Sequence, residues 1–522
     1  MRHSLTLMVI VFAAVVLRAQ GCGGQGNATL QTQAAFLGGS IAPVLAAAPG
    51  APFIWYADFA PGQVTLPGIG TSCLAMSPAL WPLVDGLGGG APPMPASGTF
   101  SVSLGIPTAA SLLGLTIYTQ FGALDSSAPN GVAISNPVSV QLTIPDYALP
   151  TANNMSGFGT SLHRAVPLQD GRYTLICGGG SGNLTAPTPS NLVEMYDHYT
   201  RTFSPVSIMA GGPRTLHTGT RLQDGRVLVT GGIGSTTGNV DTGEVYDPAT
   251  DTWTPVLNVM QNVRAAHTAT LLNDGRVLIT GGNGVFSTGP NGGFGPIFSS
   301  AYDTVDFYDP VTNTFMPAPN MLEKRIGHSA VLLPGGQVLL AGGVAGSFQP
   351  PIVGFPPLPV YATAGEIYDP SVNAFSPTGL TPVSRIVGVM NVLPSGSVLY
   401  AGGANGPLLC TTAAADFWDV TTNTWSPLPT SLPTDVALAA SATLADGSIV
   451  ITGGGQGCVA MFNSTTDVTV FNPNTFQFFP KAPLPAPKGS HTISPLPDGS
   501  FLLVGGLDAS GFAVSTGYIW NQ

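Results

Sequence analysis

The stretch RAAHTATLLNDGRVLITGG, from Arg264 to Gly282, is one copy of the repeat that builds most of this chain. A second copy, RTLHTGTRLQDGRVLVTGG, runs from Arg214 to Gly232. Short alternating apolar runs in units of about 50–60 residues are typical of a β-propeller, whose blades are stable only side by side. The repeat therefore predicts an all-β, seven-bladed propeller. Its Gly-Gly pairs begin at residues 178, 231, 281, 342, 402, 453 and 505.

A complete repeat contains four runs of β character. In the third repeat the first two are joined by an Asn-Asp-Gly-Arg turn at 273–276, in which glycine accepts a positive φ. An aromatic residue at the start of the fourth run is expected to pack between neighbouring blades. In the third repeat the runs are 268–272, 277–282, 306–310 and a fourth that starts at Phe315.

The seventh repeat holds only three of these runs. A segment upstream of the first repeat, YALPTANNM at 147–155, reads like FMPAPNM at 315–321, which is a fourth run and its link to the next blade. An open sheet edge would be a liability. We therefore predict that residues 146–155 close the last blade and that the propeller spans 146–522.

The Gly-Gly pair, the following Tyr246-Asp247-Pro248 and Trp253 resemble the kelch repeat. The resemblance covers about 370 of the 522 residues and implies a kelch-type propeller. Repeats five and six depart from it because neither has the histidine at the start.

The Asp-Gly-Arg-Val-Leu-x-Thr-Gly-Gly pattern also resembles the propeller of the galactose and glyoxal oxidases. That family uses copper held by tyrosines and histidines, with one tyrosine cross-linked to a cysteine. Here Cys177, Cys410 and Cys458 follow or end second strands, and none lies on a first strand. The resemblance thus implies the fold without the copper site, because fold likeness alone does not transfer function.

Composition narrows the classes of partner. The chain has 26 acidic and 15 basic residues, for a net charge of −11, and only 8% of its residues are charged. Its 68 glycines and 48 prolines indicate a turn-rich protein. Without a basic tract, such a chain is a poor candidate for binding nucleic acid or an anionic membrane. We expect a monomer.

The first 21 residues have the form of a secretory signal peptide, with Arg2, an apolar run and small residues before Gly21. Cys22 directly follows and raises the alternative of a lipid anchor. Residues 27–145 lack the repeat but alternate in short runs between turns, which predicts a β-sandwich of immunoglobulin type. No later apolar run is long enough to span a membrane.

Five cysteines cannot all pair with one another. Cys410 and Cys458 occupy the same loop of neighbouring repeats and are the disulfide candidates. Cys177 reads as a small buried thiol.

A basic residue recurs three positions before the repeat histidine. If the first strands line the central channel, these bases form an arc at one mouth that suits carboxylates or sulfates. The alternative is structural, because five third strands carry an acid that could pair with the base inside its own blade. The positions are Thr160, Arg214, Arg264, Arg325, Arg385, Val436 and Lys488, and the acids are Glu194, Glu244, Asp306, Glu366 and Asp416.

The repeat histidines are expected to be structural. A metal site needs ligands that converge on one point, whereas one histidine per blade distributes them around a ring. They are His163, His217, His267, His328 and His491.

Two long insertions follow second strands, at 283–304 and 344–364. Long loops in compact repeats often carry function. Their aromatic residues could form a platform for sugar rings, or they could fold down on the rim of the propeller. These residues are Phe294, Phe298, Tyr302, Phe348, Phe355 and Tyr361.

No nucleophile elbow, zinc-protease motif or phosphate loop is present, and no cofactor is implied. We expect a secreted or cell-surface protein that binds a carbohydrate or an extracellular protein, not an enzyme. Two alternatives remain: a copper oxidase with an unrecognised site, and a purely structural surface protein. The candidate ligand-binding residues are Arg214, Arg264, Arg325, Arg385 and Lys488 for charge, and Phe294, Phe348 and Tyr361 for stacking.

Overall fold

The computed structural model describes residues 147–521, with gaps at 158, 170, 185–186, 236–237, 285–299, 352–356 and 459–461, together with Ser97 and the strands between residues 29 and 143. The signal-peptide and Cys22 predictions lie outside the described residues. Those described contain no α-helix, and none of them forms a helix that could span a membrane.

Among the described residues, thirteen strands precede the propeller. Five of them form a sheet in the order β2-β13-β11-β5-β8, with β12 paired to β11. The β-sandwich remains a prediction, since nothing beyond these strands is described there. The strands are β1 (Thr29–Gln31), β2 (Ala35–Phe36), β3 (Ser40–Ile41), β4 (Val44–Ala46), β5 (Phe53–Asp58), β6 (Pro61–Leu66), β7 (Gly70–Leu74), β8 (Trp81–Asp85), β9 (Thr99–Ser101), β10 (Leu104–Gly105), β11 (Thr116–Leu124), β12 (Val132–Ile134) and β13 (Val138–Thr143).

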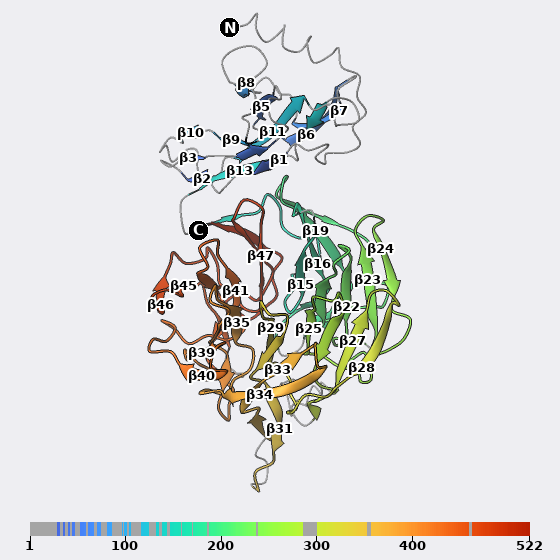
Figure 1. The fold of residues 1–522 in the computed structure, drawn as a ribbon, viewed down its shortest axis with the longest axis vertical. Helices are drawn as coiled ribbons and strands as arrows, with labels where there is room; N and C mark the ends of the chain where they lie inside the picture. The colour runs from blue at the N-terminus through green and yellow to red at the C-terminus, as the bar shows by residue number, and fades with distance from the viewer. Residues whose placement is uncertain are drawn as a thin grey trace, which may run out of the picture.

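Seven four-stranded antiparallel sheets follow, which confirms the all-β, seven-bladed propeller (Figure 1). Within blades one to six the strands pair in chain order from the channel outwards. Blade one is β15 (Arg164–Pro167), β16 (Tyr173–Cys177), β19 (Val193–Asp197) and β20 (Thr202–Pro205); blade two is β21 (Thr218–Arg221), β22 (Val227–Thr230), β23 (Gly243–Asp247) and β24 (Thr252–Pro255); blade three is β25 (Thr268–Leu271), β26 (Val277–Thr280), β27 (Val305–Asp309) and β28 (Thr314–Ala318); blade four is β29 (Ser329–Leu332), β30 (Val338–Ala341), β33 (Ala364–Asp369) and β34 (Ala374–Leu380).

Blades five and six repeat this order, whereas blade seven takes its outer strand from the segment before blade one. Blade five is β35 (Val389–Val392), β36 (Val398–Ala401), β39 (Ala415–Asp419) and β40 (Thr424–Pro427); blade six is β41 (Ala440–Thr443), β42 (Ile449–Thr452), β45 (Val468–Asn472) and β46 (Gln477–Pro480); blade seven is β47 (Thr492–Pro495), β48 (Phe501–Val504), β49 (Gly517–Asn521) and β14 (Tyr147–Pro150).

The ring closes through β14, which lies far from the rest of blade seven in the sequence. Tyr147 to Pro150 pair antiparallel with Asn521 to Tyr518 on β49, so the outer strand of the last blade comes from the segment before the first. This strand lies inside the 146–155 segment expected there. The first strands of all seven blades contact one another in a ring, including β15 with β47.

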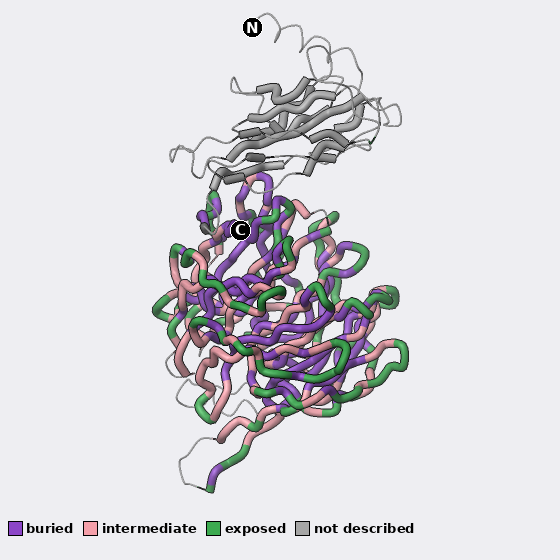
Figure 2. The backbone as a smooth tube through the Cα atoms, turned by 60° about the vertical axis from the view of Figure 1, so that its left-hand side comes forward, coloured by how far each residue is buried: buried purple, intermediate pink, exposed green. Residues whose placement is uncertain are grey.

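The hydrophobic core lies between adjacent blades. Leu175 and Cys177 of blade one pack in one cluster with Val227, Val229 and Tyr246 of blade two. The second strands are buried along their whole length from β22 onwards, whereas the turns and loops are exposed (Figure 2). Burial on both faces of the sheet explains why these strands are continuous apolar runs.

Because strands alternate in direction, the loops between second and third strands (2–3 loops) and the links from a fourth strand to the next first strand (4–1 links) share one face, called here the loop face. Small hairpins extend the 2–3 loops of four blades. They are β17 (Gly180–Ser181) with β18 (Thr188–Pro189), β31 (Val344–Phe348) with β32 (Leu358–Tyr361), β37 (Ala404–Asn405) with β38 (Cys410–Thr411), and β43 (Gly455–Gln456) with β44 (Asn463–Ser464).

Candidate functional site

The recurring basic side chains lie inside the blades and not at the channel mouth. Each is at most 1% exposed, so solvent and ligands do not reach them. They sit at the ends of the 4–1 links, before the first strands begin. The basic arc expected from the sequence therefore does not form at the surface. These residues are no longer candidates for binding a ligand. They are Arg214, Arg264, Arg325, Arg385 and Lys488.

Each buried arginine is neutralised within its own blade. Arg264 Nη2 donates to Asp306 Oδ2 at 2.7 Å, and Nη1 donates to the carbonyls of Gly281 and Thr304 at 2.9 and 3.0 Å. Burial lowers the pKa of Arg264 and raises that of Asp306. The guanidinium thus ties the 4–1 link to the second and third strands. The equivalent pairs are Arg214–Glu244, Arg325–Glu366 and Arg385–Asp416.

Blade seven uses lysine without an acid. Lys488 Nζ donates to the carbonyl of Gly505 at 2.8 Å and to the carbonyl and hydroxyl of Thr516 at 2.9 Å. Burial lowers the pKa of Lys488 to about 7. Neutral oxygens and the ring of Tyr518, whose centroid lies 4.9 Å from Nζ, therefore offset the cost of placing this ammonium in the interior.

The repeat histidines hold neighbouring blades together. His328 Nε2 lies 2.9 Å from the hydroxyl of Thr280 and 3.2 Å from that of Thr268, both in the preceding blade. Burial lowers the pKa of His163, His328 and His491 to about 3 and that of the other two well below the usual value. The rings are therefore neutral near pH 7.

The Gly-Gly pairs lie where a neighbouring blade comes closest. Gly231 has a φ of +60°, and a Cβ there would lie 2.4 Å from the carbonyl oxygen of Arg264 and 2.6 Å from the His267 ring. A side chain at this position would both strain the backbone and push the next blade away.

A collar of residues with positive φ surrounds the loop-face mouth of the channel. In it, Gly327 N donates to Ala266 O, Val387 N to Gly327 O, and Leu438 N to Val387 O. Val387, a β-branched residue, has a φ of +48°. Local sequence patterns did not predict this collar. Its members are Leu162, Leu216, Ala266, Gly327, Val387, Leu438 and Ser490.

Copper chemistry of the oxidase type needs several donors at one point. Each repeat histidine instead lies in a different blade, and four of the five place Nε2 on a threonine hydroxyl of the preceding blade. Across the described part of the chain, no group of three or more His, Cys, Asp or Glu side chains could hold a metal ion. These residues do not fit a copper centre, and we derive no step through one.

The insertion of blade four forms a hairpin that extends from the loop face, β31 with β32 (Figure 1). Phe348 is 56% exposed and pairs across the hairpin with Leu358. Phe355 and the blade-three aromatics Phe294 and Phe298 lie outside the described residues. The structure therefore brings one predicted stacking residue, Phe348, to the surface.

A groove of about 550 Å³ lies between this hairpin and the 2–3 loop of blade five, with Tyr361 on its wall. The Tyr361 hydroxyl donates to the carbonyl of Gly406 at 2.9 Å, and burial raises its pKa. Tyr361 thus joins the two loops and offers the groove only part of its ring. The other lining residues are Leu358, Pro359, Pro382, Val383, Ser384, Asn405, Gly406 and Pro407.

A disulfide joins Cys410 of the blade-five hairpin to Cys458 of the blade-six loop. Thr411 N also donates to the carbonyl of Gly457, so the two loops are held by backbone and side chain together. The 2–3 loops of blades four, five and six are therefore linked in a row, the first two by Tyr361 and the last two by the disulfide.

Cys177 is a free, buried thiol whose pKa burial raises to about 12.

The fold is similar to that of a solved structure, and part of the sequence matches a known family. The sequence pattern of the Kelch motif family matches residues 214–256. The structure is similar to that of a fungal alcohol oxidase described as having catalytic diversity among the AA5 family, in complex with copper, with a TM-score of 0.53 and 18% identity over 72% of this chain and 75% of that chain. It is also similar to the structure of YjhT, with a TM-score of 0.45 and 16% identity over 70% of this chain and 95% of that chain. No curated protein matches the sequence, and the oxidase likeness shows the fold alone.

Proposed function

We propose that this kelch-type propeller is an extracellular binding module, and that the groove between blades four and five holds a carbohydrate ligand. The observation that carries the proposal is the groove itself, with the exposed Phe348 beside it. Its volume of about 550 Å³ lies within the roughly 300–1,000 Å³ of small-ligand sites.

The chemistry of the groove suits a neutral ligand. Its walls are Leu358, Val383, several prolines and part of the Tyr361 ring, and Ser384 and Asn405 supply hydrogen-bonding groups. No charged side chain is among the described residues that line it. Sugars present apolar ring faces and hydroxyls, which such a mixture of apolar walls and a few polar groups can bind.

The groove is built on constrained loops. Tyr361 is bonded to Gly406 on the opposite wall, and the disulfide fixes Cys410 at the end of the same loop. A preorganised site loses less conformational entropy when a ligand binds. A disulfide also suits an oxidising compartment, which supports the proposed secretion.

The experiment is a polysaccharide array probed with the purified protein. Ser384→Trp should occlude the groove, Phe348→Ala should remove the exposed ring, and Val311→Ala, on a 3–4 turn of the opposite face, is the matched control. We expect a hit that Ser384→Trp abolishes, Phe348→Ala weakens and Val311→Ala leaves unchanged.

The other results would each overturn the carbohydrate proposal. No hit, or a hit that ignores both groove variants, would do so directly. Stoichiometric copper with peroxide formation would instead favour the oxidase alternative. Copurification of a protein that Ser384→Trp releases would favour a protein partner.

A further inference from the structure

Blade one keeps the acid of the repeat but has lost its base. Thr160 occupies the position of the buried arginine: its N–H donates to Val514 O, as Arg264 N–H donates to Val240 O two blades further on. Glu194 occupies the position of Glu244 and Asp306. Blades two to five all pair an arginine with the acid at these two positions.

The missing guanidinium leaves the carboxylate of Glu194 incompletely paired. Its Oε1 accepts hydrogen bonds from Ser156 Oγ at 3.1 Å and Gly157 N at 3.0 Å. Its Oε2 is buried and has no hydrogen-bond partner, and the residue is only 6% exposed. A buried charge without a counter-ion is costly, so the site favours a cation.

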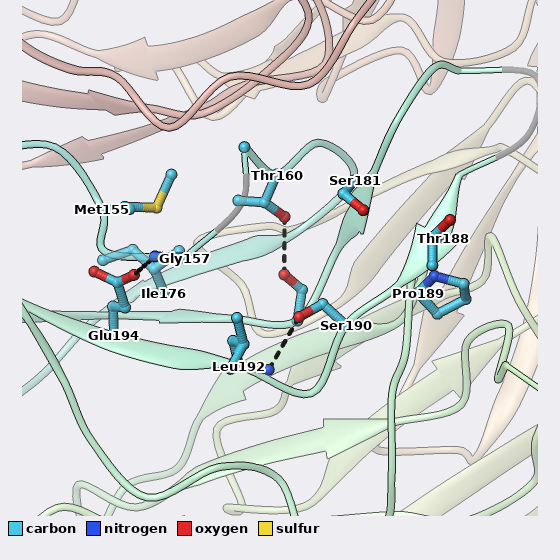
Figure 3. Close-up of a pocket in the computed structure, with 12 residues that line it drawn as sticks. Met155, Gly157, Thr160, Ile176, Ser181, Thr188, Pro189, Ser190, Leu192 and Glu194 are labelled. Carbon is cyan, nitrogen blue, oxygen red and sulfur yellow. Dashed lines mark hydrogen bonds between the residues drawn. The ribbon is translucent and has the colours of Figure 1, made fainter.

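A cavity of about 200 Å³, called here the blade-one cavity, opens beside this carboxylate (Figure 3). Its volume far exceeds the roughly 30 Å³ that one water occupies in the liquid. Thr160, Ser190, Leu192 and Glu194 line it, and none of its described lining residues is a lysine or arginine. The chain therefore supplies no base of its own among them.

The acceptors that receive an arginine elsewhere are present here as well. In blade three, Arg264 Nη1 donates to the carbonyls of Gly281 and Thr304. The matching carbonyls are those of Gly178, which accepts from Thr160 Oγ1, and of Leu192, which accepts from Gly178 N just as Thr304 O accepts from Gly281 N. A planar guanidinium would therefore find one carboxylate oxygen and the lone pairs of two carbonyls.

The other blades indicate which cation fits. In blades two to five the acid at this position is paired with an arginine. The planar guanidinium presents two parallel N–H donors, which match the two oxygens of a carboxylate. Lysine occurs only in blade seven, where Tyr518 replaces the acid. Blade six has lost both members, with Val436 and Thr469 at the two positions. Blade one is thus the odd case, an acid retained without its arginine.

We propose that the blade-one cavity binds the guanidinium group of a ligand from outside the chain, seated on Glu194. The site is independent of the groove between blades four and five. The ligand would supply the charge and the forked donors that Arg264 and its equivalents supply in their blades. The same chemistry could come from a small alkylguanidinium or from an arginine side chain of a polypeptide.

The test is calorimetric titration of the purified protein with methylguanidinium and, in a second arm, with a short arginine-containing peptide. Glu194→Gln keeps the shape and removes the charge, whereas Thr160→Arg fills the cavity from within. Asp241→Asn, in a loop of blade two, is the matched control. We expect saturable binding, weakened about tenfold or more by Glu194→Gln, abolished by Thr160→Arg and unchanged by Asp241→Asn.

Thr160→Arg should also raise the melting temperature without ligand, and methylguanidinium should raise that of the wild type only. This keeps the proposal testable if Glu194→Gln folds poorly. Tighter binding of the peptide would identify a polypeptide source, and equal binding a small one. Absence of binding in both arms, or binding that Thr160→Arg leaves intact, would overturn the proposal.

Discussion

Arg264 and Asp306 form an ion pair at 2.7 Å in which both side chains are at most 1% exposed. Residues 42 positions apart are thereby joined within one blade. The pair is one of four similar pairs. Because it is buried, its environment determines how far the loss of one partner lowers the free energy of unfolding. A buried pair is not strong evidence of net stability, but breaking one leaves a charge unsatisfied.

Arg264→Ala should lower the free energy of unfolding by about 3–5 kcal/mol, because Asp306 would remain buried without its cation. Arg264→Met with Asp306→Leu should cost markedly less, since no charge is then left behind. Urea denaturation followed by circular dichroism measures both. The control is Arg226→Ala, which breaks the exposed pair with Asp224 and should change stability by about 0–1 kcal/mol. Equal losses in Arg264→Ala and Arg226→Ala would contradict this assignment.

Stability should fall as the pH drops from 6.5 towards 3. The buried histidines have folded-state pKa values below the usual 6.5, about 3 for His328, so in this window the unfolded chain binds protons that the folded chain does not. Each such histidine contributes a slope of about 1.4 kcal/mol per pH unit once it is charged in the unfolded state. Denaturation midpoints at pH 7.5, 6.5, 5.5 and 4.5 measure the combined slope.

His328→Gln isolates one histidine. Its slope between pH 5 and 6.5 should be smaller than that of the wild type by up to one proton, whatever the variant does to stability at pH 7.5. Lys488 does not contribute in this range, because it is charged in both states below its folded pKa of about 7. An unchanged slope would show that His328 titrates normally in the folded protein.

Closure of the ring through β14 predicts a severe effect at Ala148. This residue is 2% exposed and lies opposite the buried Trp520. Ala148→Glu should lower the free energy of unfolding by about 3 kcal/mol or more, because it places an unpaired charge against the core. The exposed Pro150, changed to Ala, is the control on the same strand. The tryptophan emission spectrum measured without denaturant should shift to the red only in Ala148→Glu. Identical spectra of this variant and the wild type would argue against this closure.

The disulfide between blades five and six should stabilise the chain. Its half-cystines are 48 residues apart, for which chain entropy predicts a contribution of about 4 kcal/mol as an upper value. Cys410→Ser with Cys458→Ser should lower stability by up to that amount and weaken binding in the groove. Cys177→Ala, at the free buried thiol, should not affect groove binding. A double variant as stable as the wild type would show that the ring already holds these loops.

Much of the fold could be predicted from local sequence. The continuous apolar second strands, the Asp-Gly turn that follows Leu272 and the aromatic at Trp253 each indicate a blade, and seven copies of the repeat indicate a ring. The likeness of 147–155 to 315–321 located the closing strand because a fourth strand has its own recognisable link. These patterns are local, so they can be recognised without knowing which residues pack against them in the tertiary structure.

The site could be predicted only in part. Cys410 and Cys458 were recognisable as partners because equivalent loops of adjacent blades lie side by side. The placement of Arg264 was not recognisable, since a base before a channel strand can face the mouth or turn back to its own blade. That choice depends on the position of Asp306, which pairing across the sheet brings near.

The sequence by itself determined the all-β class, the number of blades and the strand that closes them, because these follow from repeated local patterns. Only the tertiary structure decided which charges are buried and where the surface is hollow. The blade-one cavity illustrates the reason. Neither Thr160 nor Glu194 alone indicates a site in the sequence. The space between them exists because packing keeps the blade in the form that holds an arginine elsewhere, while Thr160 is too short to fill it. Burial and cavities are properties of the assembled ring, to which every blade contributes.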